Sequence, residues 1–439
     1  MNPRLVPIYF EVGRDQDFDI QMDNLHRLFD QDIELLDPLP LGAELPEAEA
    51  VVFPQLLGTA YHQVDDFEAI DLPILFITSE FGTMLPWDWE IASYLRSKGI
   101  KTIAPYNIDQ TRIVIQALRV KRELKDTKFL VFQDDPGEGF QSEIFKRFFW
   151  WENESIQGLF EKFGVTLVKK SYKKLAAEAK MIPDAEAEKV IQEREINIGS
   201  ITPKALNSAI KLYLAFKKEL EQDPAIRGMG ANCLNESRFS DTTPCLAWSM
   251  LYDEQQLIWG CEADTMSMIT KYIIHRSLDV PIMMTNIYPF LLGQTALKHE
   301  RIAEFPQVDS EPENHILVAH CGYLGVVPTS FATEWSLNPK VLAIVDDNAT
   351  AIDARLPEGP ITLAKLGPSM DKWTIMEGEL TGYAQYPDSD CLNGGVIKVT
   401  DGHGLVTNAY SHHYLVTTGH NKTAIDLVGK VFDLEMEEI

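Results

Sequence analysis

The sequence has few cysteines, a deficit of basic residues and no long apolar run. Its five cysteines are widely spaced and form no CxxC pair, so we expect reduced thiols rather than a disulfide framework. The 39 Lys and Arg residues are outnumbered by 66 Asp and Glu. This excess argues against nucleic acids and anionic membranes as partners, because both bind clustered basic side chains. No stretch reaches about twenty apolar residues, so no membrane-spanning helix is expected.

The N-terminal segment, residues 1–7, also lacks the apolar run of a signal peptide. With the reduced cysteines, this favours a cytoplasmic protein. The chain contains neither a GxGxxG nor a Walker sequence, so no nucleotide cofactor is expected. A length of 439 residues with 45% apolar and 24% charged residues is typical of a globular protein with two or three domains.

The first two-thirds of the chain alternate short apolar runs with helical patterns. A helix is expected at 88–98, where Gly99 supplies a stop signal, and another at 112–125. Thr202 followed by Pro203 predicts the start of a further helix, as cap and first-turn proline. This alternation indicates an α/β fold with parallel sheets. The predicted buried strands are residues 50–53, 73–77, 100–104 and 128–132.

After about residue 300, strand patterns follow one another without intervening helices, separated by Gly, Pro, Asn and Asp. This texture is typical of an antiparallel sheet or barrel. One last helix is expected at 422–432. The expected domains are therefore 1–108 (α/β), 109–300 (α/β) and 301–439 (β-rich). The predicted strands of the last domain are 315–321, 341–346, 361–365, 373–377 and 395–400.

A buried strand at 257–261 ends directly before Glu262. Catalytic groups in open α/β sheets lie at the carboxyl ends of strands, so Glu262 is a candidate site residue. Asp264 lies in the same position, but an acid in the first turn of a helix also has a purely structural explanation. The sequence leaves both interpretations of Asp264 open.

Four segments carry a family resemblance. They are Thr-Pro-Cys-Leu-Ala at 243–247, Cys-Glu-Ala-Asp at 261–264, Ala-His-Cys-Gly at 319–322 and Ser-His-His-Tyr at 411–414, the last followed by Gly419 and His420. In this order they resemble the L-fucose/L-arabinose isomerase superfamily. The resemblance implies two flavodoxin-like parallel-sheet domains followed by a C-terminal antiparallel β-barrel-like domain. It also implies a homo-oligomer, a trimer or a hexamer.

The resemblance assigns roles to several residues. Glu262 corresponds to a metal ligand and proton-transfer group, and His320 to a substrate or metal contact. His412 and His413 are adjacent, so on a strand they point to opposite faces and at most one is expected to reach a metal. The resemblance favours His413, with His412 as the alternate. Asn286 stands where the family has a second acid, and its amide oxygen can ligate a hard cation but cannot serve as a base.

These features predict a metal-dependent aldose–ketose isomerase that acts on a neutral pentose or 6-deoxyhexose through an enediol. A carboxylate must carry the proton between C1 and C2, a task worth roughly 10²–10⁴-fold in rate. A divalent cation stabilises the enediolate as a Lewis acid, and mixed carboxylate and imidazole ligation suits Mn²⁺. Because Asn286 replaces an acid, the alternative is a catalytically reduced sugar-binding paralogue.

Overall fold

The computed structural model describes residues 1–11, 14–135, 143–148, 152–290, 302–304, 307–308, 311–340, 348–386, 389 and 393–439. The predicted strand at 341–346 and Cys391 lie outside these residues. The chain divides into two compact units. The first consists of Met1–Lys125, Arg276–Asp279 and Thr423–Glu435, and the second of Asp126–His275, Val280–Lys422 and Met436–Ile439. The predicted division at residues 108 and 300 stays a prediction.

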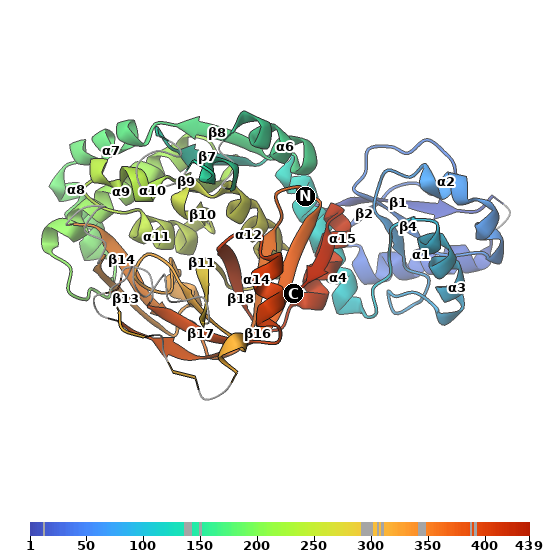
Figure 1. Cartoon of the computed structure of the whole chain (residues 1–439). Helices are drawn as coiled ribbons and strands as arrows, with labels where there is room; N and C mark the ends of the chain where they lie inside the picture. The colour runs from blue at the N-terminus through green and yellow to red at the C-terminus, as the bar shows by residue number, and fades with distance from the viewer. Residues whose placement is uncertain are drawn as a thin grey trace. The chain divides into compact units, whose positions relative to one another are not determined.

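The first unit is built on a parallel sheet in the order β2-β1-β4-β5-β6, with β3 paired to β1 (Figure 1). Stacked and edge-on rings of Phe53, Phe67 and Phe76 lie in its core, with centroids 5.0 and 5.6 Å apart. The strands are β1 Arg4–Tyr9, β2 Glu34–Leu35, β3 Leu39–Pro40, β4 Ala50–Phe53, β5 Ile74–Phe76 and β6 Thr102–Ile103; the α-helices are α1 Gln16–Phe29, α2 Val64–Glu68, α3 Trp89–Ser97 and α4 Ile108–Leu124.

The second unit opens with a parallel sheet in the order β10-β9-β7-β8. Its longest helix, α9 (Pro203–Gln222), starts as predicted, since Thr202 Oγ1 accepts a hydrogen bond from the Ala205 amide. The strands are β7 Lys128–Phe132, β8 Thr166–Lys170, β9 Ile226–Ala231 and β10 Ile258–Gly260; the other α-helices are α5 Phe145–Phe148, α6 Asn153–Phe163, α7 Tyr172–Met181, α8 Asp184–Glu193, α10 Cys233–Glu236, α11 Cys245–Gln255 and α12 Thr265–Leu278.

The same unit contains a closed antiparallel barrel. Its strands follow the order β15-β18-β11-β12-β17-β16, and pairing between β15 and β16 closes it. Strand β19 pairs at β16, and β13 with β14 forms a separate two-stranded ribbon. The strands are β11 Ile282–Pro289, β12 His315–Ala319, β13 Glu334–Pro339, β14 Thr350–Arg355, β15 Gly359–Leu366, β16 Lys372–Ala384, β17 Gly394–Val399, β18 His413–Thr418 and β19 Glu435–Glu438; the helix is α14 Gly402–Asn408. The last helix, α15 Lys422–Phe432, belongs from Thr423 onward to the first unit.

The predicted class, α/β with parallel sheets and an antiparallel barrel, is confirmed. The flavodoxin-like assignment of the two parallel sheets stays a prediction. Strand β11 continues to Pro289, so Asn286 lies on a barrel strand. No helix in the described part of the chain is long and apolar enough to cross a membrane.

Candidate metal centre

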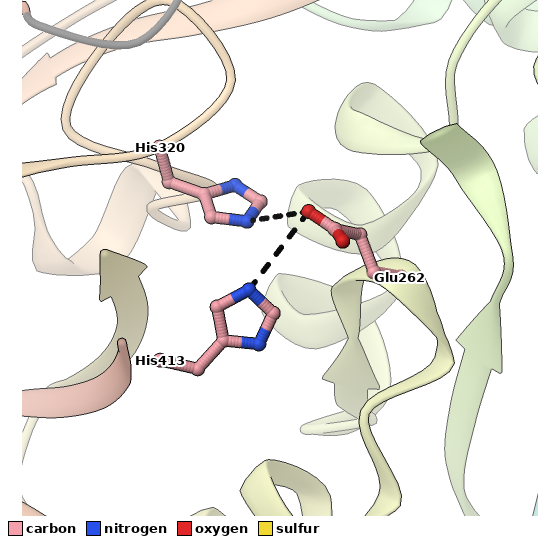
Figure 2. Close-up of side chains that lie close together, drawn as sticks. All are labelled: Glu262, His320 and His413. Atoms are coloured by element: carbon pink, nitrogen blue, oxygen red, sulfur yellow. Dashed lines mark ion pairs between the residues drawn. The ribbon is translucent and has the colours of Figure 1, made fainter. Parts of the chain in front are cut away.

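Three side chains from distant parts of the second unit converge on one point: Glu262, His320 and His413 (Figure 2). Glu262 Oε1 lies 3.3 Å from Nε2 of His320 and 3.9 Å from Nε2 of His413. The two imidazoles are 1% and 0% exposed, and the Glu262 side chain is 12% exposed. One carboxylate therefore faces two buried rings, each through its Nε2 atom.

Glu262 is presented by a strained turn at the carboxyl end of β10. The residues after Gly260 form a short 3-10 segment in which Glu262 has φ 54° and Ala263 has φ 56°. Left-handed backbone is uncommon for residues with a Cβ, and costs of order 1–3 kcal/mol each. The turn follows a close contact between strand and helix: a Cβ at Gly260 would lie 2.5 Å from Met268 Sδ of the following helix, so position 260 has no room for a side chain.

His320 follows the last residue of β12 and begins a tight turn. Its amide donates to the Tyr323 carbonyl at 2.6 Å, and the Tyr323 amide donates back at 3.2 Å. Both central residues have positive φ, 58° at Cys321 and 91° at Gly322, as in a type I′ turn. Neither ring nitrogen of His320 has a hydrogen-bond partner among the described residues. Burial opposes the charged ring, but Cys321 and Glu262 raise the pKa of His320 to about 10.

The side chains of His413 and His412 point in different directions, as the sequence predicts for neighbouring residues on a strand. His413 opens β18 and points to Glu262, whereas the His412 ring lines a largely apolar cavity of about 370 Å³ with Phe145, Ile287 and Leu405. Burial lowers the pKa of His412 to about 3. The structure thus brings His413 to the cluster and leaves His412 beside it, with ring centroids 4.4 Å apart.

Asn286 stands next to the cluster in register. It is the direct cross-strand partner of His413 on β18 and of Ala319, the residue before His320, on β12. Directly opposed residues in an antiparallel pair share one face of the sheet, so the Asn286 and His413 side chains lie on the same face. Its Nδ2 donates to the Tyr288 hydroxyl at 3.0 Å. Its Oδ1 is buried and has no hydrogen-bond partner among the described residues, which leaves a carbonyl oxygen available as a ligand.

The donor set fits a divalent cation. Two ligand atoms held about 2.1 Å from one ion lie about 3 Å apart when cis and about 4.2 Å apart when trans. The observed separations of 3.3 and 3.9 Å fall in this range. One carboxylate, two imidazoles and an orphaned amide oxygen are ligands that manganese, cobalt and zinc accept. Glu262, His320 and His413 offer ligand atoms that all lie within 4.8 Å of one another, a group that can hold a metal ion.

Behind His413 lies an ionic network that the sequence did not reveal. Asp264 Oδ2 lies 2.9 Å from His413 Nδ1 and accepts from Lys365 Nζ at 3.0 Å. Lys365 also donates to Ser267 Oγ at 2.7 Å. All four residues are at most 2% exposed. Burial disfavours the charged carboxylate, but Lys365 and His413 hold the pKa of Asp264 well below its usual range.

The sequence left two interpretations of Asp264 open. The structural one, an acid at the start of a helix, is confirmed, and a role in the site stays a prediction. Asp264 caps α12, because Oδ1 accepts from the Ser267 amide at 2.8 Å, and it also contacts the site. Lys365 had no signal in the sequence beyond being a charged residue within a predicted strand. Its partner Asp264 is 101 residues away, and only barrel pairing brings the two together.

The described cysteines near the centre are free thiols: Cys233, Cys245, Cys261 and Cys321. Cys233 and Cys261 are buried, and burial raises their pKa values. The Glu262 amide donates to Cys233 Sγ at 3.4 Å. Cys245 is buried as well, whereas Cys321 is partly exposed.

No family model matches the chain, and a search of curated proteins found no match either.

Proposed function

We propose that the chain is a metal-dependent aldose–ketose isomerase that acts on a neutral pentose or 6-deoxyhexose through an enediol. The observation that carries the proposal is the cluster of Glu262 with His320 and His413. The resemblance to the L-fucose/L-arabinose isomerase superfamily supplies the reaction and the substrate class. The cluster supports the proposal, because its three residues come from three segments that carry the resemblance and are far apart in the sequence.

In this proposal Glu262, His320 and His413 hold the metal, and Asn286 adds its amide oxygen. When bound, the cation, proposed to be Mn²⁺, supplies Lewis-acid stabilisation of negative charge on two neighbouring sugar oxygens. The left-handed turn at Glu262 fixes where its carboxylate lies. The net charge of −27 is compatible with a neutral sugar and a cationic metal.

Proton transfer falls to Glu262. Of the two carboxylates at the centre, Asp264 is fully buried and bound by Ser267 and Lys365, whereas Glu262 retains 12% exposure. Only an accessible carboxylate can take a proton from C2 of a bound sugar and return it at C1. Asn286 cannot share this task, because an amide has no basic oxygen at neutral pH.

A second proposal is a catalytically reduced sugar-binding protein that keeps the proposed metal site. It is favoured by one observation: the residue opposite His413 in the barrel is Asn286 rather than an acid. With one accessible carboxylate, Glu262 must serve as both ligand and base. If those roles exclude each other, the protein binds sugars without converting them.

The deciding experiment is a Mn²⁺-supplemented conversion assay over a panel of pentoses and 6-deoxyhexoses. Its variants are Glu262→Gln and, as matched control, Glu379→Gln, which removes an exposed acid on barrel strand β16. Turnover that survives in the control and disappears in Glu262→Gln supports the isomerase. Binding of Mn²⁺ and sugar without turnover in the wild type would replace it with the binding protein.

A further inference from the structure

The hydrogen bond between His413 and Asp264 determines which nitrogen of His413 faces the metal centre. Nδ1 points at the Asp264 carboxylate, 2.9 Å away, and Nε2 points at Glu262, 3.9 Å away. A carboxylate only accepts hydrogen bonds, so the ring proton belongs on Nδ1. Nε2 then presents its lone pair toward Glu262. The network therefore selects the tautomer that a metal ligand needs.

Hydrogen bonds hold the Asp264 carboxylate in this orientation. Its Oδ1 accepts from the Ser267 amide at 2.8 Å, and its Oδ2 accepts from Ser267 Oγ at 2.7 Å and from Lys365 Nζ at 3.0 Å. These bonds attach the carboxylate to the first turn of α12 and to β15 of the barrel. A side chain bound to two elements holds the His413 ring plane as well as its proton.

Helix capping does not require this arrangement. A cap needs only the bond that the Ser267 amide donates to Asp264 Oδ1, and the side-chain oxygen of an Asn can accept the same bond. Nor does stability require it, because a fully buried ion pair is commonly no better for folding than apolar side chains of similar size. The contact with His413 is what a carboxylate at this position adds.

We propose that Asp264 is a positioning residue for the metal centre, held by Lys365 and Ser267, and that it fixes the tautomer and the orientation of His413. The inference rests on the proposed metal centre and deepens it. Carboxylates that orient metal-binding histidines typically contribute about 10–100-fold to metal affinity. Lys365 neutralises the buried carboxylate, so that Asp264 orients His413 without adding uncompensated negative charge beside the ion.

The test compares full-length variants with Mn²⁺ alone, by calorimetry or by the electron paramagnetic resonance signal of free Mn²⁺. In Asp264→Asn the amide group keeps the cap but no longer selects the Nδ1-protonated ring, and we expect about 10–100-fold weaker binding. The double variant Asp264→Asn/Lys365→Met removes the unpaired lysine, so that the comparison does not depend on how the single variant folds. We expect the same loss in both.

The matched control is Asp401→Asn. Asp401 caps α14 in the same unit through a bond from the Gly404 amide at 2.8 Å. We expect its Mn²⁺ affinity to stay within about twofold of the wild type, well inside the loss expected for Asp264. A second readout needs no metal: ¹⁵N spectra of the imidazoles report which nitrogen of His413 bears the proton, and we expect Nδ1 in the wild type and a shift toward Nε2 in the double variant.

The outcomes separate this inference from the proposed function. A wild type that binds no Mn²⁺ overturns the metal centre and, with it, the positioning role. A wild type that binds Mn²⁺ while both Asp264 variants bind it equally well overturns the positioning role alone. Loss of affinity in both variants, with the tautomer shift and an unaffected Asp401→Asn, establishes it.

Discussion

Two buried aspartates in different units have the same position in the chain, between a strand and a helix, but different hydrogen-bond partners. Asp88, in the first unit, comes after strand β5 and directly before α3, and Asp264, in the second, comes after β10 and before α12. They are 7% and 0% exposed. The carboxylate of Asp88 accepts from Thr78 Oγ1 at 2.5 Å, whereas that of Asp264 accepts from a lysine as well.

The difference shows which neighbouring side chains distinguish a strand end at the candidate metal centre from one elsewhere. Burial raises the pKa of Asp88, against the effect of its bond from Thr78, while two neighbouring side chains hold the pKa of Asp264 low against its burial. Those neighbours, Lys365 and His413, come from barrel strands β15 and β18. Within the described residues, three potential metal ligands come together at Glu262 and nowhere in the first unit. The barrel strands therefore supply two of the side chains that surround Asp264, Lys365 and His413, and the parallel sheet supplies neither of them.

The largest expected effect tests the barrel's contribution directly. His413→Ala removes a ligand and should weaken Mn²⁺ binding by at least about 100-fold, more than loss of a supporting residue. His412→Ala removes the adjacent ring, which lines the neighbouring cavity, and should change the affinity by less than about threefold. Calorimetric titration of both variants measures the contrast. Equal losses would show that the two histidines are not divided between the two faces as described.

Several elements of the fold followed from local sequence, whereas His320 and His413 were assigned from the family resemblance. The strand at 128–132 and the helix at 422–432 match β7 and α15, because apolar periodicity and flanking Gly, Asn and Asp determine such elements locally. The placement of Glu262 at a strand exit has the same origin. Closure of the barrel does not, since it depends on pairing between β15, β16 and β18. Lys365 could not be assigned for that reason: its strand was predicted, but the contact between Lys365 and Asp264 was not.

A second comparison concerns stability. In Asp264→Asn, Lys365 loses its counter-charge in a fully buried site, and the cost should be about 3 kcal/mol or more. Asp88→Asn keeps an acceptor for Thr78 and removes a buried charge, so its free energy of unfolding should change by less than about 1 kcal/mol. Urea denaturation at pH 7 measures both. Similar costs for the two variants would contradict the distinction between a paired and an unpaired carboxylate.

A smaller effect is expected from restoring an acid. Asn286→Asp places a carboxylate opposite His413, and we expect Mn²⁺ to bind about tenfold more tightly, because a charged oxygen ligand is stronger than an amide oxygen. Asn338→Asp, on ribbon strand β13, is the control for added charge and should leave the affinity unchanged. Tighter binding in both would assign the gain to net charge. No gain in Asn286→Asp would place its side chain outside the coordination sphere.

The smallest effect is a difference in pH dependence between two strand exits outside the metal centre. Asp134 follows β7, and although burial opposes its ionisation, bonds from Ser171 Oγ and the Lys173 amide lower its pKa. Its contribution is present above the unfolded pKa of about 3.9 and is lost as the pH falls through the folded value. Asp88 has a raised pKa, so its carboxylate destabilises the fold at neutral pH and this cost disappears on protonation.

The difference in urea midpoint between the wild type and a variant without the carboxylate should therefore change in opposite directions for Asp134 and Asp88 as the pH falls from 7 to 3. Relative to Asp134→Asn, the wild type should lose stability as the pH falls, and relative to Asp88→Asn it should gain stability. The opposite signs follow from the surroundings: polar donors at the start of α7 reach Asp134, whereas burial dominates at Asp88. If both differences move in the same direction, the carboxylates of Asp88 and Asp134 have similar electrostatic surroundings, and the contrast between the two strand exits is wrong.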